Sequence, residues 1–192
     1  MTNSTHRLFF ALTPADSWLS QLQDLQRELN QHDWSRYIRW TPLDNFHITL
    51  RFVGQCDNEL AQFLWQQLGD QIIPLHYRLL PVRISLFPGQ RRPVVLALNL
   101  QKTEALEQLV NCINGLCDDA GLTPERNSYR PHLTLGRVKQ RIPDPAKEKI
   151  ATLLEDSLHL PPASVAASLQ MLHSDTRPDG AVYTALASQR LE

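Results

Sequence analysis

The sequence predicts an α+β fold made of two similar lobes. Strand-like and helix-like stretches alternate along the chain, and a strand with the pattern His-x-Thr-Leu occurs twice, at His47 and at His132. A helix and a connecting segment precede each of these strands, which resembles a weak internal duplication. A chain of 192 residues suits one domain over 1–192 with its own core.

The first half of the chain predicts two strands that each lead to a helix. Residues 7–12 are an apolar run that ends at a proline, as expected of a buried strand. Apolar residues then recur at helical spacing over 16–31. A short strand is expected within 36–42, an alternating strand at 46–54 and a second helix at 58–68.

The second half repeats the mixture of strands and helices. In order, we expect strands at 75–88 and 93–100, a helix at 103–120 that ends at Gly121, a strand at 129–138, a short helix within 143–162, and a closing hairpin of strands 165–174 and 181–191. Turns rich in proline, glycine and arginine separate the first two strands and the last two.

Composition narrows the class of protein. Hydrophobic residues make up 42% and charged residues 20%, which is typical of a soluble globular chain. A net charge of −1 gives no field for holding long nucleic acids nonspecifically. The three cysteines lack CxxC spacing, which disfavours a disulfide framework or a zinc cluster. With no signal-peptide core and no membrane-length apolar run, we expect a cytoplasmic monomer that does not bind membranes.

The repeated motif is unlikely to be a coincidence of composition. Random placement of the residues gives about 0.07 copies of His-x-Thr-Leu, so two copies by chance have a probability on the order of one in 400. Either strand alone would be more often structural than functional. Together they favour a shared site, whereas His6, His32, His76, His159 and His173 are expected to be structural.

Strand alternation places the motif residues on one face of each strand. His47 shares a face with Thr49, and His132 shares a face with Thr134, while the aliphatic residues between them face a core. On strict alternation Arg51 extends the first polar face.

The second polar face is extended at both of its ends. Arg130 precedes the motif, and Gly136 follows it without a side chain, which would leave room for a ligand. Two imidazoles on facing walls suit acid–base chemistry on a phosphate, and threonine hydroxyls can donate to its oxygens. Two histidines are too few ligands for a catalytic zinc ion, which disfavours metal-dependent hydrolysis. We expect no cofactor.

At these residues the sequence resembles the 2H phosphoesterase superfamily. Within it the chain is most similar to the RNA 2′,3′-cyclic phosphodiesterases, formerly described as 2′-5′ RNA ligases. The resemblance covers nearly the whole chain and includes RLFFAL, DNFHITLRFVG, RPHLTLGR and the closing pattern at Ser174, Gly180 and Tyr183. It implies a bilobal, duplicated fold in which two mostly antiparallel sheets form a central groove with helices outside.

The resemblance also implies a reaction and its residues. The reaction is metal-independent hydrolysis of an RNA or nucleoside 2′,3′-cyclic phosphate to the 2′-phosphomonoester. His47 would be the proton donor and His132 the proton acceptor, while Thr49, Thr134 and Arg137 would bind the phosphate. The residues alone are symmetric and do not say which histidine is the acid.

Further substrate contacts are expected at a few other positions. Strict alternation turns Arg137 away from His132, unless a bulge near Gly136 redirects it. Phe10 matches a family position that packs on a base, although a place in the core is equally expected of it. Arg51 and Arg130 are further candidates for substrate binding. Arg91 and Arg92 form either an RNA contact or a solvated turn.

Two other functions remain open on the residues. The chain could act mainly as a 2′-5′ RNA ligase or tRNA-processing factor, because acid–base catalysis can run in reverse. It could also be a noncatalytic module that binds RNA or nucleotides, although both motifs are intact.

Overall fold

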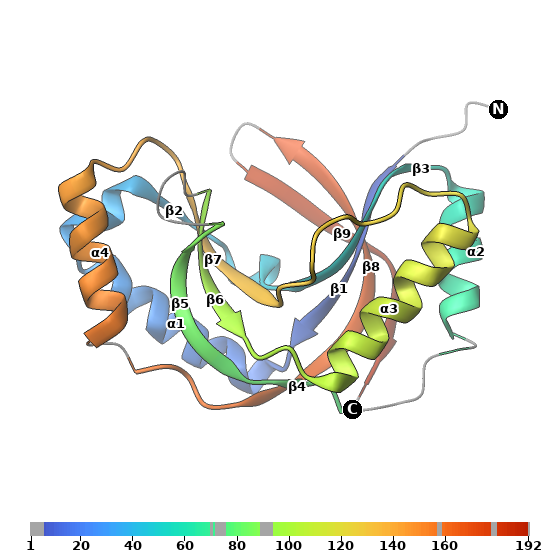
Figure 1. Ribbon diagram of the computed structural model, residues 1–192, viewed down its shortest axis with the longest axis horizontal. Helices are drawn as coiled ribbons and strands as arrows, with labels where there is room; N and C mark the ends of the chain where they lie inside the picture. Colours follow the sequence, from blue (N-terminus) through green and yellow to red (C-terminus); the bar gives the residue numbers. More distant parts are fainter. Residues whose placement is uncertain are drawn as a thin grey trace.

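The predicted α+β fold is confirmed by the computed structural model (Figure 1). The structure describes residues 6–69, 71, 76–88, 94–156, 159–177 and 180–191. Its elements are β1 (His6–Pro14), α1 (Asp16–Asn30), β2 (Ile38–Trp40), β3 (Ile48–Cys56), α2 (Asn58–Gly69), β4 (Arg78–Leu79), β5 (Pro81–Phe87), β6 (Val95–Leu100), α3 (Glu104–Asp119), β7 (His132–Val138), α4 (Asp144–Asp156), β8 (Ser164–Arg177) and β9 (Gly180–Arg190), with short 3-10 turns at Asp33–Tyr37 and Leu43–Asn45.

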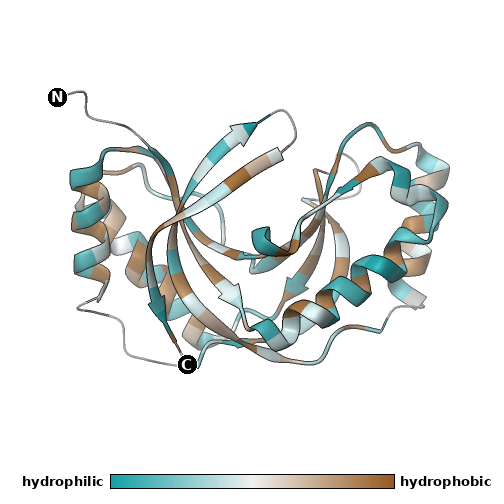
Figure 2. Ribbon diagram, turned by 180° about the vertical axis from the view of Figure 1, so that it is seen from behind, coloured by the Kyte–Doolittle hydropathy of each residue, from teal (hydrophilic) through white to brown (hydrophobic). Residues whose placement is uncertain are grey.

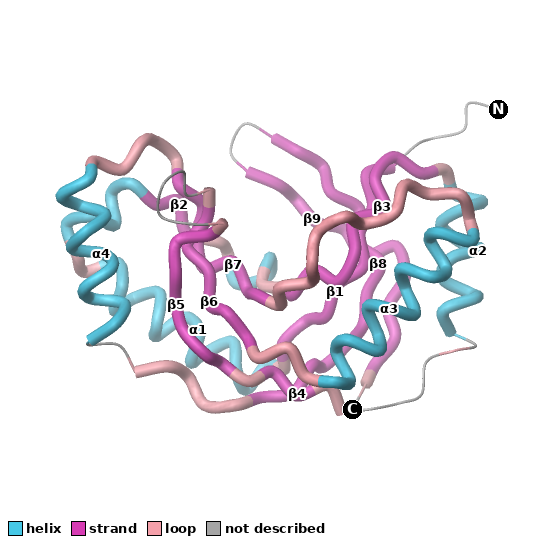
Figure 3. The backbone as a smooth tube through the Cα atoms, viewed as in Figure 1, coloured by secondary structure: helices cyan, strands magenta, loops and turns pink. Residues whose placement is uncertain are grey.

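The strands form two antiparallel halves that meet in the middle of the molecule. The strand order is β4-β8-β1-β3-β7-β6-β5, with β2 added to β7 and β9 added to β8. Strands β3 and β7 join the halves through one residue pair, Ile48 with Leu133. Helices α2 and α3 flank one half, and α1 and α4 flank the other (Figure 3). The two motif strands therefore lie next to each other at the junction.

The order of elements repeats along the chain, and the two halves exchange strands. When the short strands β2 and β4 and the last strand β9 are set aside, the series β1-α1-β3-α2-β5 is followed by β6-α3-β7-α4-β8. The last strand of each series pairs in the other half, since β5 pairs with β6 and β8 pairs with β1. Neither half completes its sheet alone, so the two motif strands are fixed relative to each other.

Helices α1, α2 and α3 lie where the sequence predicts them, and α4 lies within the segment 143–162 that was expected to hold a short helix. In α1 the buried residues are Trp18, Leu22, Leu25 and Leu29, which recur at the predicted positions. Helix α3 begins at an N-cap, because the hydroxyl of Thr103 accepts a hydrogen bond from the backbone N–H of Leu106 at 3.3 Å. Hydrophobic and hydrophilic bands alternate along these helices in Figure 2. No helix in the described part of the chain is long and apolar enough to cross a lipid bilayer.

Two strand predictions need correction. The single strand expected at 75–88 is two strands, because the chain changes partners at Leu80: β4 pairs with β8, whereas β5 pairs with β6. The closing hairpin is longer than predicted, since β8 continues to Arg177. The remaining parts of the two predicted turns lie outside the described residues. They are 89–93, which includes Arg91 and Arg92, and 178–179.

Candidate active site

Both histidines of the repeated motif line one cavity at the junction of the two halves. His47 immediately precedes β3, and His132 is the first residue of β7. The cavity has a volume of about 580 Å³, and Thr49 and Thr134 also line it. The structure therefore brings together the four residues that the two motifs predict.

The two imidazoles are held in the same way. The Nδ1 atom of His47 lies 2.8 Å from the backbone oxygen of Asn45, and Nδ1 of His132 lies 2.8 Å from the backbone oxygen of Arg130. A carbonyl oxygen only accepts hydrogen bonds, so each Nδ1 carries the proton. Nε2 of each ring is thus left to accept or donate a proton in the cavity.

The two histidines differ in their surroundings. His47 packs between Phe9 and Tyr183, with ring centroids 5.0 and 4.9 Å away. Burial is the main cause that lowers the pKa of His47 from 6.5 to about 4; the hydrogen bond to Asn45 opposes it, and the positive charges of Arg137 and His132 add to it. The ring of His132 instead stacks on Phe87 at 4.6 Å. In the free protein His47 is therefore neutral at pH 7.

The lowered pKa of His47 predicts a specific pH dependence of stability. Between pH 4 and 6.5 the unfolded chain binds a proton at this residue that the folded protein does not, so stability falls as the pH falls. From pH 7 to pH 5 this histidine should account for a loss of about 2 kcal/mol in the free energy of unfolding. Urea unfolding at both pH values should show a smaller loss in His47→Gln than in wild type. An equal loss in both proteins would contradict the prediction, and His159→Gln serves as control.

A bulge in β3 corrects the prediction for Arg51. Phe10 pairs with Arg51 and Ala11 with Thr49, so Leu50 is an extra residue and alternation breaks there. Arg51 consequently turns into the protein, where it is only 5% exposed. Its guanidinium donates to the backbone oxygen of Thr123 and contacts Glu125. Arg51 does not extend the face of His47 and Thr49.

A matching bulge in β7 directs Arg137 into the cavity. Leu96 pairs with Gly136 and Ala97 with Thr134, so Leu135 is the extra residue. Arg137 therefore lines the same cavity as Thr134, despite its place in the strict alternation. Five residues after each histidine, the first wall has Phe52 and the second has Arg137.

The role expected of Gly136 also needs correction, because this glycine makes room for a strand and not for a ligand. A Cβ atom at Gly136 would lie 2.4 Å from Cγ2 of Ile38 and 3.1 Å from the backbone oxygen of Arg39. Both belong to β2, which pairs with β7 at this point. The glycine allows β2 to approach β7 and to place Arg39 beside Arg137.

Gly136→Ala should therefore destabilise the protein by about 1–3 kcal/mol, because the methyl group overpacks the contact with β2. Gly115→Ala is the matched control: Gly115 lies within α3, and nothing would touch its Cβ within 4 Å. That variant should be more stable by roughly 0.5–1 kcal/mol. Chemical denaturation measures both changes in the free energy of unfolding. A Gly136→Ala variant as stable as wild type would refute the close approach of β2 to β7.

Of the two places expected of Phe10, the structure shows the one in the core and not the one at the substrate. Phe10 is 1% exposed and stacks with Trp65, with ring centroids 6.4 Å apart. Its neighbour Phe9 lines the cavity and contacts His47. The run RLFFAL is apolar on both faces, so its pattern does not distinguish the two phenylalanines.

Arg130 lies beside the cavity and not within it. Its side chain is exposed and lines an adjoining pocket that includes His132. Its backbone oxygen holds Nδ1 of His132, as described above. At the cavity itself Arg130 thus acts through its backbone oxygen and not through its side chain.

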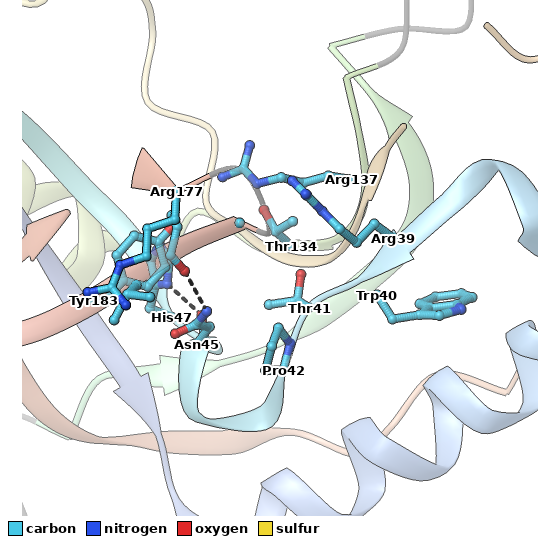
Figure 4. Close-up of a pocket in the computed structure, with 13 residues that line it drawn as sticks. Arg39, Trp40, Thr41, Pro42, Asn45, His47, Thr134, Arg137, Arg177 and Tyr183 are labelled. Carbon is cyan, nitrogen blue, oxygen red and sulfur yellow. Dashed lines mark hydrogen bonds between the residues drawn. The ribbon is translucent and has the colours of Figure 1, made fainter. Parts of the chain in front are cut away.

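Several lining residues were not predicted as site residues. A pocket of about 350 Å³, here called the arginine pocket, extends from His47 and Thr134 to Arg39, Arg137 and Arg177. In Figure 4 Arg39 and Arg137 extend on one side of this pocket, and Arg177 and Tyr183 lie next to His47 on the other. Tyr183 belonged to the closing sequence pattern. No sequence motif marked Arg39 and Arg177 as site residues, because they reach the site through the packing of β2 and of the β8–β9 hairpin.

The backbone around the arginine pocket is fixed by polar contacts. The side-chain amide of Asn45 donates to the backbone oxygen of Ala181 at 3.0 Å, which ties the segment before His47 to β9. Arg177 Nε contacts a carboxylate oxygen of Asp175 at 2.8 Å. Within the described residues no three His, Cys, Asp or Glu side chains gather where they could hold a metal ion.

Comparison with known proteins places these features in a family context. The sequence profile of the 2′-5′ RNA ligase superfamily matches residues 13–176. The RNA 2′,3′-cyclic phosphodiesterase of Thermotoga maritima is 26% identical over 188 residues, which cover 97% of this chain and 96% of that protein. The Bacillus subtilis protein of the same name is 33% identical over 105 residues, or 53% of this chain and 56% of that protein.

Solved structures share the fold over almost the full chain. LigT of E. coli, complexed with 3′-AMP, superposes with a TM-score of 0.70 at 20% identity and covers 97% of this chain and 98% of its own. The protein TT0787 of Thermus thermophilus superposes with a TM-score of 0.74 at 20% identity, covering 96% of this chain and 97% of its own. The fold of this chain is thus shared with these solved structures.

Proposed function

The chain belongs to the 2′-5′ RNA ligase superfamily, an enzyme family, and on that premise we propose that it hydrolyses 2′,3′-cyclic phosphates on RNA ends or nucleosides. The observation that carries the proposal is the matched pair of histidines. Each has its Nδ1 proton held by a backbone oxygen two residues earlier, and both line the same cavity with a threonine. Such a pair suits a reaction in which one proton is removed while another is supplied.

The proposed reaction uses one water molecule and needs no covalent intermediate. Nε2 of His132 accepts a proton from the water as its oxygen attacks phosphorus. The bond between phosphorus and O3′ breaks, and Nε2–H of His47 donates its proton to O3′, which gives a 2′-phosphomonoester. Thr49 and Thr134 donate hydrogen bonds to the nonbridging oxygens, and Arg137 stabilises the charge that develops on them.

The proton donor must be charged when substrate is bound. Burial and the nearby positive charges keep His47 neutral in the free protein by lowering its pKa, but a phosphate anion beside the ring favours its protonated form. Substrate binding therefore prepares the acid. The bell-shaped pH profile that two such groups produce is the same for either assignment, so the pH profile alone does not assign the roles.

A substrate with an aryl leaving group assigns the acid and base roles of the two histidines. p-Nitrophenolate leaves without protonation, so loss of the acid should cost much less with bis(p-nitrophenyl) phosphate than with a nucleoside 2′,3′-cyclic phosphate. His47→Ala should show this partial rescue, and His132→Ala should not. Rescue of His132→Ala in place of His47→Ala would exchange the two roles.

The overall proposal is tested with the four nucleoside 2′,3′-cyclic phosphates in excess EDTA, followed by separation of the 2′- and 3′-monophosphates. Undiminished turnover to the 2′-phosphate is expected. A 3′-phosphate product, or activity that disappears with EDTA, would contradict it.

We further propose that residues 1–192 act as one domain, with each lobe supplying one wall of the site. Monomeric state and a cytoplasmic location stay predictions.

A further inference from the structure

The side chain of Gln26 joins α1 to two segments of the site. Its amide nitrogen donates to the backbone oxygen of Thr41 at 3.0 Å and to that of Leu135 at 2.7 Å. Because both acceptors are carbonyl oxygens, the amide presents its NH2 group to them and not its oxygen. Gln26 lies one turn from the buried Leu22 and Leu29, so it borders the apolar face of α1 that packs on the sheet.

The two acceptors lie where the end of β2 meets the bulge of β7. Leu135 is the extra residue of that bulge, and its backbone oxygen also accepts a hydrogen bond from the N–H of Thr41 at 3.0 Å. A peptide oxygen has two lone pairs, so Gln26 and Thr41 together satisfy it. Since an extra residue is left out of the regular ladder, these two contacts hold the bulge in place.

The amide of Gln26 acts close to both arginines on this side of the arginine pocket. On β2, Arg39 lies two residues before Thr41. On β7, Arg137 lies two residues after Leu135 and pairs with Arg39. The two arginine side chains extend on the same side of the pocket (Figure 4). Gln26 thus ties together the two segments that carry these guanidinium groups.

Charge repulsion opposes this arrangement of β2 and β7. Like charges directly opposite each other on paired strands are destabilising, and the described residues that line the arginine pocket include no carboxylate. Strand β2 has only three residues, so few ladder hydrogen bonds hold it to β7. We propose that Gln26 is a positioning residue for Arg137: its amide holds the β7 bulge to the end of β2, and the bulge directs the guanidinium to the phosphate.

This inference rests on the proposed hydrolysis for its kinetic test. Gln26→Met keeps a long side chain that favours the helix and removes the donor. The variant should lower kcat/KM for adenosine 2′,3′-cyclic phosphate by about tenfold, because a small displacement of Arg137 weakens its contact with the developing charge. Gln23→Met, on the exposed side of the same helix, is the matched control and should keep wild-type activity.

A double variant separates positioning from a purely structural role. If Gln26 acts through Arg137, Gln26→Met should cause no further loss of kcat/KM once Arg137 is replaced by alanine. A further tenfold loss in the double variant would overturn the positioning role. The unfolding transition of each variant is recorded first. Gln26→Asn, whose amide is one methylene shorter, should show the same pattern and takes the place of a Gln26→Met variant that does not fold.

A second readout does not depend on turnover. The charge of Arg137 contributes to the lowered pKa of His47, so its displacement in Gln26→Met should raise that pKa, whereas Gln23→Met should leave it unchanged. NMR titration of the imidazole measures the shift. An unchanged pKa of His47 in folded Gln26→Met would overturn the role of Gln26. A raised pKa in a protein that hydrolyses no cyclic phosphate would instead contradict the proposed hydrolysis and leave the positioning role supported.

Discussion

Alanine at either His47 or His132 is expected to lower kcat/KM for a nucleoside 2′,3′-cyclic phosphate by about 10²- to 10⁴-fold. Each substitution removes one of the two proton transfers and leaves the threonines and Arg137 in place. Binding of the product should persist, so the loss should lie mainly in kcat.

The control for these variants is His159→Ala, since His159 is exposed and does not line the cavity. It should keep wild-type activity. The fold of all three variants is checked by their unfolding transitions, because His47→Ala could also open space between Phe9 and Tyr183. Undiminished turnover in either site variant, with the fold intact, would remove that histidine from the mechanism.

Arg137→Ala should lower kcat/KM by roughly 10²- to 10³-fold, because the guanidinium is placed to stabilise charge on the phosphate oxygens. Arg137→Lys should recover only part of the loss, since an ammonium group cannot make two parallel hydrogen bonds. Arg27→Ala, on the exposed face of α1, is the control and should be silent.

The same substitution has a second readout that does not depend on turnover. The positive charge of Arg137 contributes to the low pKa of His47, after the larger effect of burial. In Arg137→Ala the pKa of His47 should therefore rise, which NMR titration of the imidazole measures. An unchanged pKa, together with unchanged activity, would show that Arg137 does not act at this site.

Sequence patterns identified the parts of this protein that depend on local periodicity. The first three helices, the two motif strands and the His–Thr pairs follow from local spacing and alternation and were found as expected, and α4 lies within the segment where a short helix was expected. The bulges were not predictable in the same way. One extra residue in each motif strand moves Arg51 inward and Arg137 toward the cavity, and a bulge is set by pairing with neighbouring strands.

The remaining parts of the site depend on contacts between distant segments. Arg39 is brought in because Gly136 lets β2 lie against β7. Arg177 and Tyr183 are brought in because β8 crosses to pair with β1. Phe9 and Phe10 could not be separated, because both faces of β1 are buried from Leu8 to Leu12 and all five of these residues are apolar. The places of these residues are determined by how distant strands pair, and not by a pattern among their neighbours along the chain.

The central claim, that His47 and His132 face one phosphate, is tested most directly by NMR. Adenosine 2′-monophosphate is titrated into the wild-type protein while the imidazole nitrogens of both histidines are observed. The Nε2 signals of both should shift with the same dissociation constant, and the pKa of His47 should rise from about 4 as the phosphate binds. A shift confined to one histidine, or two different dissociation constants, would contradict a single phosphate site between the two strands.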